Sequence, residues 1–358
     1  MDSYDIENYL LQSLNMGLGS YIDGETSYTN SFTISVTQDG FYFIPRLPAS
    51  YLIDNELYQK IFLIANASLY PRYTLLKQTS AYFVPMHTTD IHIQRALFFP
   101  WIVGISKRLV ISNLEEFASQ LKKDEIPIME NLTIQYSKVT SIAIAGNSGS
   151  GKTYLLTYLL SVLKHNSKLV VIDPKNDTPS RWGRFNKIDV LHPSSNRSKS
   201  DFVSQINESL SAGLALIYER QEILYDDPDH KFEHYTFVID EVLSLSEGIN
   251  KAIKESFFSL ISQIALLGRA TSVHLILVSQ RFDYKSIPVS VREQLNILIQ
   301  VGNINRSTTQ FLFNDLDPNG IVIPSGKGTG LIQVIDGEHP NHVLPLLCPT
   351  YYAQKGVL

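Results

Sequence analysis

The sequence has little cysteine and no long apolar run, and both absences narrow the range of possible proteins. A single cysteine, Cys348, excludes an internal disulfide and fits a reducing compartment. No apolar run approaches the roughly 20 residues of a membrane helix, and the nearest, "ALFFPWIVGI" (96–105), is interrupted by Pro100. The start, "MDSYDIENYL", lacks the basic-then-apolar order of a signal peptide. We therefore expect a soluble, cytoplasmic protein with no integral membrane segment.

The chain also lacks an excess of positive charge. Lys and Arg total 30 against 35 Asp and Glu, which gives a net charge of −5. This balance argues against a protein that coats nucleic acid with a broad basic face. The same charge balance is compatible with a protein that binds DNA through a few basic side chains in a narrow channel. With 358 residues, of which 44 % are hydrophobic, the chain can bury a sizeable core and form two domains.

The first part of the chain is typical of a small α+β domain. Residues 31–44, "SFTISVTQDGFYFI", alternate apolar and polar side chains around Asp39-Gly40, which predicts a β-hairpin. Residues 54–70 predict a helix with Asp54 as its N-cap, and further short strands follow, broken by prolines. We expect residues 1–125 to form this domain, which serves as a collar for oligomerisation or DNA guidance, or as a surface that recruits a partner.

From residue 126 the pattern changes to strands that alternate with helices. The short runs are apolar on both faces, as expected for strands that helices cover on both sides. Such alternation predicts an α/β layer with a mainly parallel sheet, spanning residues 126–358. The runs are "SIAIAG" (141–146), "KLVVIDP" (168–174), "YTFVIDE" (235–241), "SVHLILVSQ" (272–280) and "LNILIQV" (295–301).

The first of these runs leads into a phosphate-binding loop. "GNSGSGKT" (146–153) matches the P-loop pattern, in which backbone N–H groups and a helix N-terminus surround phosphate oxygens. Lys152 is expected to reach the β- and γ-phosphates, and the Thr153 hydroxyl to bind Mg²⁺. The expected ligands of ATP are Gly146, Asn147, Ser148, Gly149, Ser150, Gly151, Lys152, Thr153 and Tyr154.

Two further strand ends carry candidate catalytic groups. "TFVIDE" ends in Asp240, which suits an outer contact to Mg²⁺, and in Glu241, which suits a general base for the attacking water. "VHLILVSQ" ends in Gln280, whose amide can sense the γ-phosphate or orient water. A strand between the P-loop strand and the acidic strand is typical of RecA-like motors, so this is the expected fold.

The ordered motifs resemble those of the FtsK/SpoIIIE (HerA-FtsK) family of DNA-translocating ATPases. The resemblance covers residues 126–340 and rests on "IAIAGNSGSGKT", "VVIDPK", "FVIDE", "LLGRATSVHLILVSQR" and "PSGKGTGLIQV". It implies a ring, usually a hexamer, with ATP bound between neighbours and duplex DNA in the central channel. The Asp-Ser-Arg element of the family is missing, and "NINRSTTQF" (303–311) offers only a shifted Arg306.

The resemblance also assigns residues beyond the phosphate site. Arg269 of "LGRATS" matches the arginine that enters the ATP site of the next subunit. Lys251 and Lys254 lie where the family carries a pore loop, and Arg281 and Lys285 are weaker candidates for contacts with DNA phosphates.

These observations predict an ATP-dependent translocase of double-stranded DNA or a coupling ATPase for DNA transfer. We expect a homo-oligomeric ring from a plasmid or another mobile element, because neither a membrane anchor nor a DNA-orienting winged-helix domain is visible in the sequence. A relaxase or a replication protein is the expected partner. Two alternatives stay open: a protein-secretion ATPase of the type VII kind, and a nucleotide-gated adaptor that recruits a DNA-processing enzyme.

Overall fold

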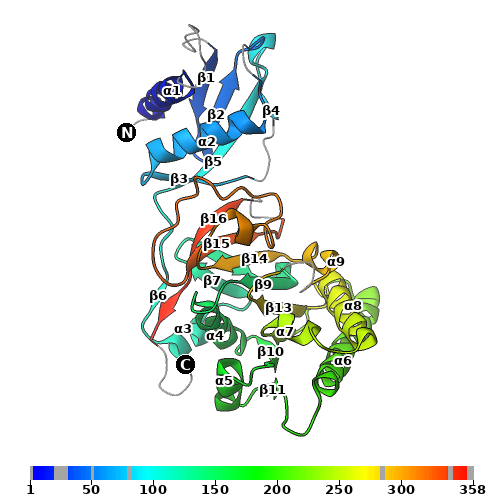
Figure 1. The fold of residues 1–358 in the computed structure, drawn as a ribbon. Coiled ribbons are helices and arrows are strands. Elements are labelled where there is room, and N and C mark those ends of the chain that lie inside the picture. Colours follow the sequence, from blue (N-terminus) through cyan, green and yellow to red (C-terminus); the bar gives the residue numbers. More distant parts are fainter. Residues whose placement is uncertain are drawn as a thin grey trace. The chain divides into compact units, whose positions relative to one another are not determined.

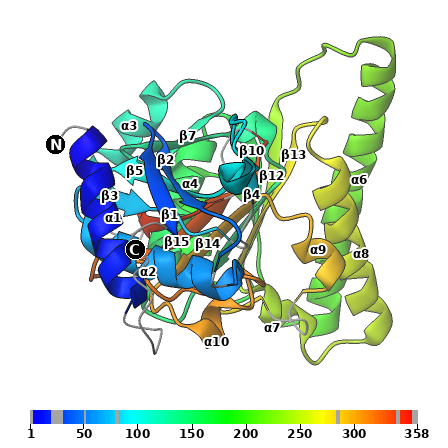
Figure 2. The ribbon, with the colours of Figure 1, turned by 90° about the horizontal axis from the view of Figure 1, so that it is seen from above.

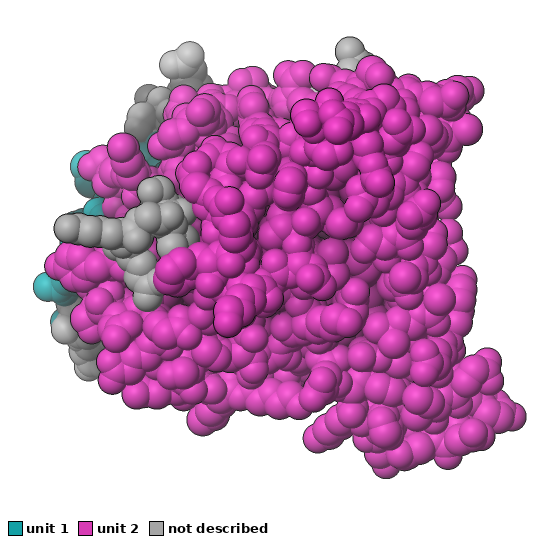
Figure 3. All heavy atoms as spheres, turned by 90° about the horizontal axis from the view of Figure 1, so that it is seen from below, with its two compact units in different colours: residues 1–106, 315–322, 342–344 teal, residues 107–314, 323–341, 345–358 magenta. Residues whose placement is uncertain are grey.

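The structure is a computed structural model that describes residues 3–19, 31–49, 52–78, 83–282, 287–337 and 342–352. The chain divides into two compact units (Figure 3). Unit 1 comprises Met1–Ser106, Asp315–Val322 and His342–Leu344, and unit 2 comprises Lys107–Asn314, Ile323–Asn341 and Pro345–Leu358. The boundary expected at residue 125 remains a prediction about folding domains. In the described part of the chain, no helix has both the length and the apolarity that a bilayer crossing needs.

Unit 1 is an antiparallel sheet packed against two helices. The strand order is β1-β2-β5-β3, with β4 also paired to β5. The strands are β1 (Phe32–Val36), β2 (Gly40–Pro45), β3 (Tyr73–Leu75), β4 (Phe83–Pro85) and β5 (Arg95–Val103); the helices are α1 (Ser3–Gly19), α2 (Asn55–Leu69) and the 3₁₀ turn η2 (Ile91–Ile93). The predicted hairpin is confirmed as β1 and β2, and the predicted helix as α2. Its N-cap is also as expected, since Asp54 accepts a hydrogen bond of 2.9 Å from the N–H of Leu57.

Aromatic side chains form the centre of the unit 1 core. Phe99 of β5 stacks on Phe41 of β2 at 4.8 Å and on Tyr58 of α2 at 4.7 Å. These rings are fully or almost fully buried, and stacked pairs add about 0.5–1.5 kcal/mol each to the stabilisation from burial. Stacked rings therefore connect the sheet to α2, within a core that also contains buried aliphatic side chains.

Unit 2 contains the sheet that the second half of the sequence predicts. Its strand order is β11-β10-β12-β13-β9-β14-β15-β16 (Figure 1). All neighbours from β11 to β14 run parallel, and β15 runs antiparallel to β14. The strands are β9 (Ser141–Ala145), β10 (Ser167–Ile172), β11 (Asp189–Leu191), β12 (His234–Ile239), β13 (Val273–Ser279), β14 (Ile297–Val301), β15 (Thr329–Val334) and β16 (Val343–Leu347). The expected mainly parallel α/β fold is confirmed, and β13 does separate β12 from β9.

Helices cover the two faces of this sheet. The long helix α6 (Lys199–Asp226) packs along α8 (Lys251–Leu267) on one face (Figure 2). On the other face lie α4 (Lys152–Leu163) and α5 (Thr178–Asn186) (Figure 1). On α6, Phe202, Ile206, Leu210 and Ile217 are buried. The remaining elements are α3 (Leu114–Gln120), α7 (Val242–Ser246), α9 (Val289–Arg292), α10 (Arg306–Thr309), β6 (Val110–Ile111), β7 (Glu125–Met129), β8 (Leu132–Gln135), β17 (Thr350–Tyr351) and the 3₁₀ turn η3 (Tyr136–Lys138).

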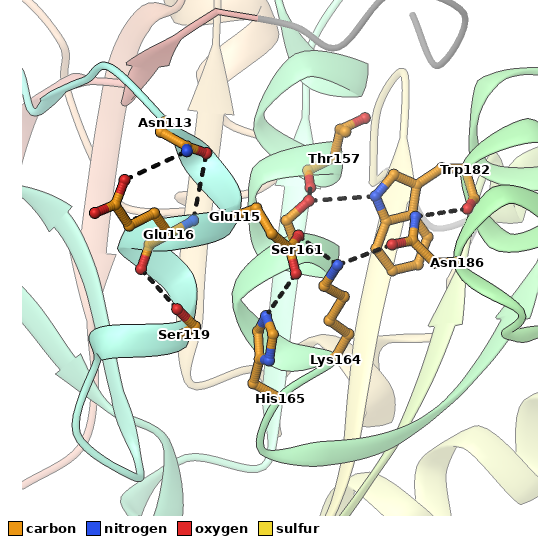
Figure 4. A network of polar contacts seen from close by, with 10 residues as sticks. All are labelled: Asn113, Glu115, Glu116, Ser119, Thr157, Ser161, Lys164, His165, Trp182 and Asn186. Atoms are coloured by element: carbon orange, nitrogen blue, oxygen red, sulfur yellow. Dashed lines mark hydrogen bonds and ion pairs between the residues drawn. The ribbon is translucent and has the colours of Figure 1, made fainter.

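A polar network fixes α4, the helix that follows the P-loop, to its neighbours (Figure 4). Lys164, just beyond α4, donates to the carboxylate of Glu115 on α3 at 2.5 Å and to the amide oxygen of Asn186 at the end of α5 at 2.8 Å. The indole N–H of Trp182 on α5 donates to Ser161 Oγ on α4 at 3.2 Å. Because these contacts join α3, α4 and α5, the C-terminal half of α4 is held from both sides.

Unit 1 also buries a charged side chain. Lys77 is 1 % exposed, and its ammonium donates to Gln59 Oε1 and, at 3.1 Å, to the carbonyl of Asn319. Burial lowers the pKa of Lys77 to about 8, although the charge of Asp317 acts in the opposite direction.

The pKa of Lys77 predicts how the stability of unit 1 depends on pH. Below pH 8 the amine is protonated in both states, so the folded state bears the full cost of a buried charge. Between pH 8 and 10.5 the unfolded chain binds more protons, so the free energy of unfolding rises with pH. This contribution amounts to at most about 3 kcal/mol, and it disappears in Lys77→Met.

Urea unfolding in a Trp182→Phe background, followed by the fluorescence of Trp101, measures this effect in unit 1. Between pH 7.5 and 10, we expect the free energy of unfolding of the wild type to rise relative to that of Lys77→Met. Lys60→Met, a substitution on α2 of the same unit, serves as the control and should run parallel to the wild type. A constant difference between wild type and Lys77→Met across this range would contradict the prediction.

Candidate nucleotide site

The P-loop leaves the sheet at the end of β9 and leads directly into α4. Two of its glycines are required by geometry. Gly146 has φ 156°, and a Cβ there would lie 2.3 Å from the carbonyl oxygen of Val301; Gly151 has φ 111° and lies against Gly328. The N–H groups of the first turn of α4 have no partners within the helix, so they are free for an anion.

The side chains of this loop fit a phosphate group. The Lys152 ammonium donates to the carbonyls of Gly146 and Asn147, the latter at 3.1 Å, and so lies over the loop. Burial lowers the pKa of Lys152, as does the charge of Lys175, while Glu241 and Asp240 raise it in part. The hydroxyl of Ser150 is buried and has no hydrogen-bond partner among the residues that the structure describes. An ammonium bound only to carbonyls and an unpaired buried hydroxyl are both groups that a triphosphate would satisfy.

Asp240 follows β12 and lies at the same edge of the sheet. Its N–H donates to the carbonyl of Ile172 at 2.9 Å, which ties the end of β12 to β10. Burial and then the charge of Asp173 raise the pKa of Asp240 to about 6, and Lys175 opposes the shift. A carboxylate in such a position gains from a nearby cation, so Asp240 and the Thr153 hydroxyl fit the hard oxygen ligands that Mg²⁺ prefers.

Glu241 is held more firmly than its neighbour. Its backbone has the left-handed conformation (φ 46°, ψ 58°) between β12 and α7, and the residue is 6 % exposed. Its Oε2 lies 2.6 Å from the Lys175 ammonium, and its Oε1 accepts a hydrogen bond of 3.3 Å from the N–H of Gln280. The carboxylate thus bridges the chain segments that follow β10 and β13.

The loop after β10 contributes residues for which the sequence analysis assigned no role. Asp173 is fully buried and accepts hydrogen bonds from the N–H groups of Lys175 (3.0 Å), Asp177 (2.7 Å) and Ser180 (3.1 Å). It thereby fixes the backbone that carries Lys175. Burial lowers the pKa of Lys175, but the hydrogen bond to Glu241 and the charges of Glu241, Asp240 and Asp173 raise it overall. The signal in the sequence was a charged pair, Asp173 and Lys175, directly after a buried strand.

Gln280 lies at the end of β13, beside the P-loop. Together with Gly146, Asn147 and Gln300 it lines a cavity of about 520 Å³. Arg281 lines the same cavity. The structure therefore brings Lys152, Asp240, Glu241 and Gln280 to one edge of the sheet, as the sequence predicted.

Tyr154 has a partner within unit 2. Its ring stacks on Tyr351 of β17 at 4.0 Å, and its hydroxyl accepts a hydrogen bond of 2.8 Å from the Tyr351 N–H. The side chain thus holds β17 against α4, and its contact with a nucleotide remains a prediction.

Arg269 lies away from the P-loop within its own subunit. It is exposed, follows α8, and lines a cavity of about 570 Å³ together with Lys123, Lys138 and Lys231. It precedes β13, whereas Gln280 follows that strand. Seven residues of strand span about 20 Å, which is longer than any side chain, so Arg269 cannot reach the P-loop of the same chain.

The candidate DNA contacts are spread over different elements. Lys251 and Lys254 lie in the first turn of α8, where the Lys251 ammonium is 3.7 Å from Glu255 and the Lys254 ammonium is 5.7 Å from the Phe258 ring. Arg306, which was not among these candidates but marks the shifted remnant of the Asp-Ser-Arg element, is the first residue of α10. Lys285 lies outside the described residues.

Comparison with known proteins finds chains of similar sequence and of similar fold. No family model matches the chain. The curated Ftsk domain-containing protein YdcQ of Bacillus subtilis (strain 168) is 22 % identical over 236 residues, which cover 63 % of this chain and 47 % of YdcQ. The chain thus spans about half the length of this relative.

Two solved structures share the fold. The pCW3 conjugation coupling protein TcpA, a monomer form with ATPγS, matches with a TM-score of 0.54 and 15 % identity, covering 96 % of this chain and 95 % of TcpA. EssC (ATPases 2 and 3) from Geobacillus thermodenitrificans matches with a TM-score of 0.52 and 16 % identity, covering 72 % of this chain and 50 % of that one. These likenesses confirm the RecA-like fold, and the match to YdcQ supports the resemblance to FtsK/SpoIIIE proteins that the motifs carry.

Proposed function

We propose that this chain is an ATP hydrolase that moves double-stranded DNA or couples ATP hydrolysis to DNA transfer, as a homo-oligomeric ring. The observation that carries the proposal is the convergence of Lys152, Asp240, Glu241 and Gln280 at the carboxyl edge of a parallel sheet. A site that only binds nucleotide needs the P-loop. A buried carboxylate next to that loop adds the group that hydrolysis requires.

In this proposal the residues divide the chemistry among them. The P-loop N–H groups and Lys152 hold the β- and γ-phosphates, and Thr153 and Asp240 hold Mg²⁺, which supplies neutralising charge to the phosphates. Glu241 accepts a proton from the attacking water, the water oxygen bonds to the γ-phosphorus, and the bond to the ADP oxygen breaks. Gln280 lies beside Glu241 and orients the water.

The position of Arg269 supports a ring. Because the length of β13 separates this guanidinium from its own P-loop, it can serve only the nucleotide of a neighbouring copy. There it would neutralise charge that develops on the γ-phosphate, an effect worth about 10³–10⁵ in rate in NTPases. The cavity is lined by four basic residues and by the carboxylates of Asp124 and Asp336. The excess of positive charge on this face suits a phosphate-bearing neighbour.

Double-stranded DNA is proposed as the partner because of the whole-chain likeness to TcpA. That match covers nearly all of both chains, whereas the match to EssC covers half of the longer protein. TcpA is a conjugation coupling protein, and we therefore propose that this chain acts in DNA transfer by a plasmid or another mobile element. A relaxase or a replication protein would then be its partner. Lys251, Lys254, Arg281 and Lys285 are the proposed contacts with DNA phosphates.

The proposed catalytic groups can be separated by two substitutions. Lys152→Ala should abolish ATP binding, because the cation over the loop is lost. Glu241→Gln should retain ATP binding while turnover falls by about 10²–10⁴-fold, the contribution typical of a general base. Isothermal titration and a phosphate-release assay measure the two effects. Glu222→Gln, on an exposed part of α6, is the control, and normal turnover in Glu241→Gln would refute the assignment of the base.

The DNA partner predicts a salt-dependent stimulation of hydrolysis. Duplex DNA should raise the ATPase rate at low salt, and high salt should remove this effect, because phosphate contacts release counterions. In Lys251→Ala/Lys254→Ala the slope of log affinity against log salt should fall by about 2, near 0.9 for each lost contact. Measurements at two salt concentrations suffice. Indifference to DNA at both would refute the proposal and favour a secretion ATPase or an adaptor.

The ring predicts that a defect in Arg269 acts on the neighbouring site. Mixing Arg269→Ala with wild-type protein should lower the rate below the sum of the two separate populations, since a wild-type P-loop next to a mutant copy lacks its arginine. Lys187→Ala, a substitution directly after α5, is the control variant and is mixed with wild-type protein in the same way. Rates that simply add would show that Arg269 acts in its own subunit or not at all.

A further inference from the structure

Lys175 forms the shortest charged contact that the structure gives to Glu241. The Nζ–Oε2 distance is 2.6 Å, and the second carboxylate oxygen accepts the N–H of Gln280. An ammonium ion at this distance competes with a proton for the same oxygen atom. Before Glu241 can take a proton from water, this contact has to be exchanged for another.

The surroundings of Lys175 allow such an exchange. Its backbone is fixed, because the buried carboxylate of Asp173 binds the N–H groups of Lys175 and Asp177. Its side chain, by contrast, is 49 % exposed, while that of Glu241 is 7 % exposed. The lysine can therefore change partner by rotating its long side chain, and Glu241 cannot follow it.

The nearest alternative partner is a phosphate held by the P-loop. The Lys152 ammonium binds the carbonyl of Gly146, whose N–H donates to the carbonyl of Gln280 at 3.3 Å. The N–H of Gln280 in turn donates to Glu241, the partner of Lys175, so both ammonium groups border the same site. A γ-phosphate bound by Lys152 would therefore lie within range of Lys175, and it carries more negative charge than a single carboxylate. ADP lacks the γ-phosphate, so in a site that holds ADP the Lys175 ammonium stays paired with Glu241.

We propose that Lys175 moves from Glu241 to the γ-phosphate when ATP binds, so that the base is released only in a site that holds a triphosphate. The inference rests on the proposed function, because it presupposes that Glu241 is the base. In the nucleotide-free site Lys175 is a positioning residue for Glu241. In the loaded site it is a ligand of the nucleotide, and the departure of phosphate returns it to the carboxylate.

The first test compares binding of ATPγS and ADP, each with Mg²⁺, to the full chain. Lys175→Met should weaken ATPγS binding about 10-fold or more, the usual worth of a hydrogen bond between charged groups, and change ADP binding less than about 2-fold. Lys175→Arg, which keeps the charge, should restore most of the preference. Lys168→Met, at the opposite end of the same β10 segment and exposed, is the matched control and should bind like wild type. An equal loss for both nucleotides, or no loss, overturns the inference.

A second test examines the competition between the two partners. Glu241→Gln should tighten ATPγS binding, because Lys175 then does not have to break an ion pair before it contacts the γ-phosphate. In Lys175→Met/Glu241→Gln this gain should vanish. If the gain persists in the double variant, it arises only from the lost repulsion between the carboxylate of Glu241 and the nucleotide. The proposed exchange of Lys175 between partners is then refuted.

The two proposals fail in different ways. A wild-type chain that binds neither nucleotide, or that hydrolyses no ATP with DNA present, refutes the proposed function. A wild-type chain with DNA-stimulated hydrolysis, combined with an unchanged triphosphate preference in Lys175→Met, refutes only the role of Lys175.

Discussion

The site depends on the parallel pairing of β10, β12, β13 and β9, which makes four segments end at one edge of the sheet. Because the carboxyl ends of parallel strands meet at one edge of a sheet, the polar residues that directly follow these strands gather there. Asp173, Asp240, Gln280 and the P-loop occupy these points. Three carboxylates, those of Asp173, Asp240 and Glu241, thus gather beside two ammonium groups, and their mutual effects on pKa follow from this crowding.

The charges in this cluster are not equivalent, because their backbone supports differ. The Asp173 carboxylate accepts hydrogen bonds from its own loop and from Ser180, so its role is to hold the backbone of this loop. Asp240 has a pKa raised by burial and by Asp173, so a cation would compensate it. Glu241 is paired with a lysine that is half exposed. One carboxylate is therefore structural, one is suited to a metal ion, and one is held by a partner that can leave.

The rest of unit 2 keeps the P-loop in position. The network around Lys164 and Trp182 fixes α4 to α3 and α5, and the Tyr154–Tyr351 pair holds β17 on the first turns of the same helix. Segments far apart in sequence therefore hold one helix, whose N-terminus faces the loop. Unit 1 is stabilised differently, by stacked rings around Phe99, and carries one buried lysine at an energetic cost.

By itself, the sequence determined the elements and the identity of the phosphate loop. The pattern "GNSGSGKT", the apolar runs that end in Asp240-Glu241 and Gln280, and the N-cap at Asp54 are local signals, and each depends on residues within one or two turns of chain. Residue order also implied a strand between β12 and β9, through the resemblance to RecA-like motors. Only the tertiary structure paired Lys175 with Glu241, enclosed Asp173 in its loop, and placed Arg269 a strand length from the P-loop of its own chain. The first and last of these relations arise from the order of strands in the sheet, which no short stretch of sequence encodes, and the enclosure of Asp173 depends on the path of its loop, which the residue pattern does not specify.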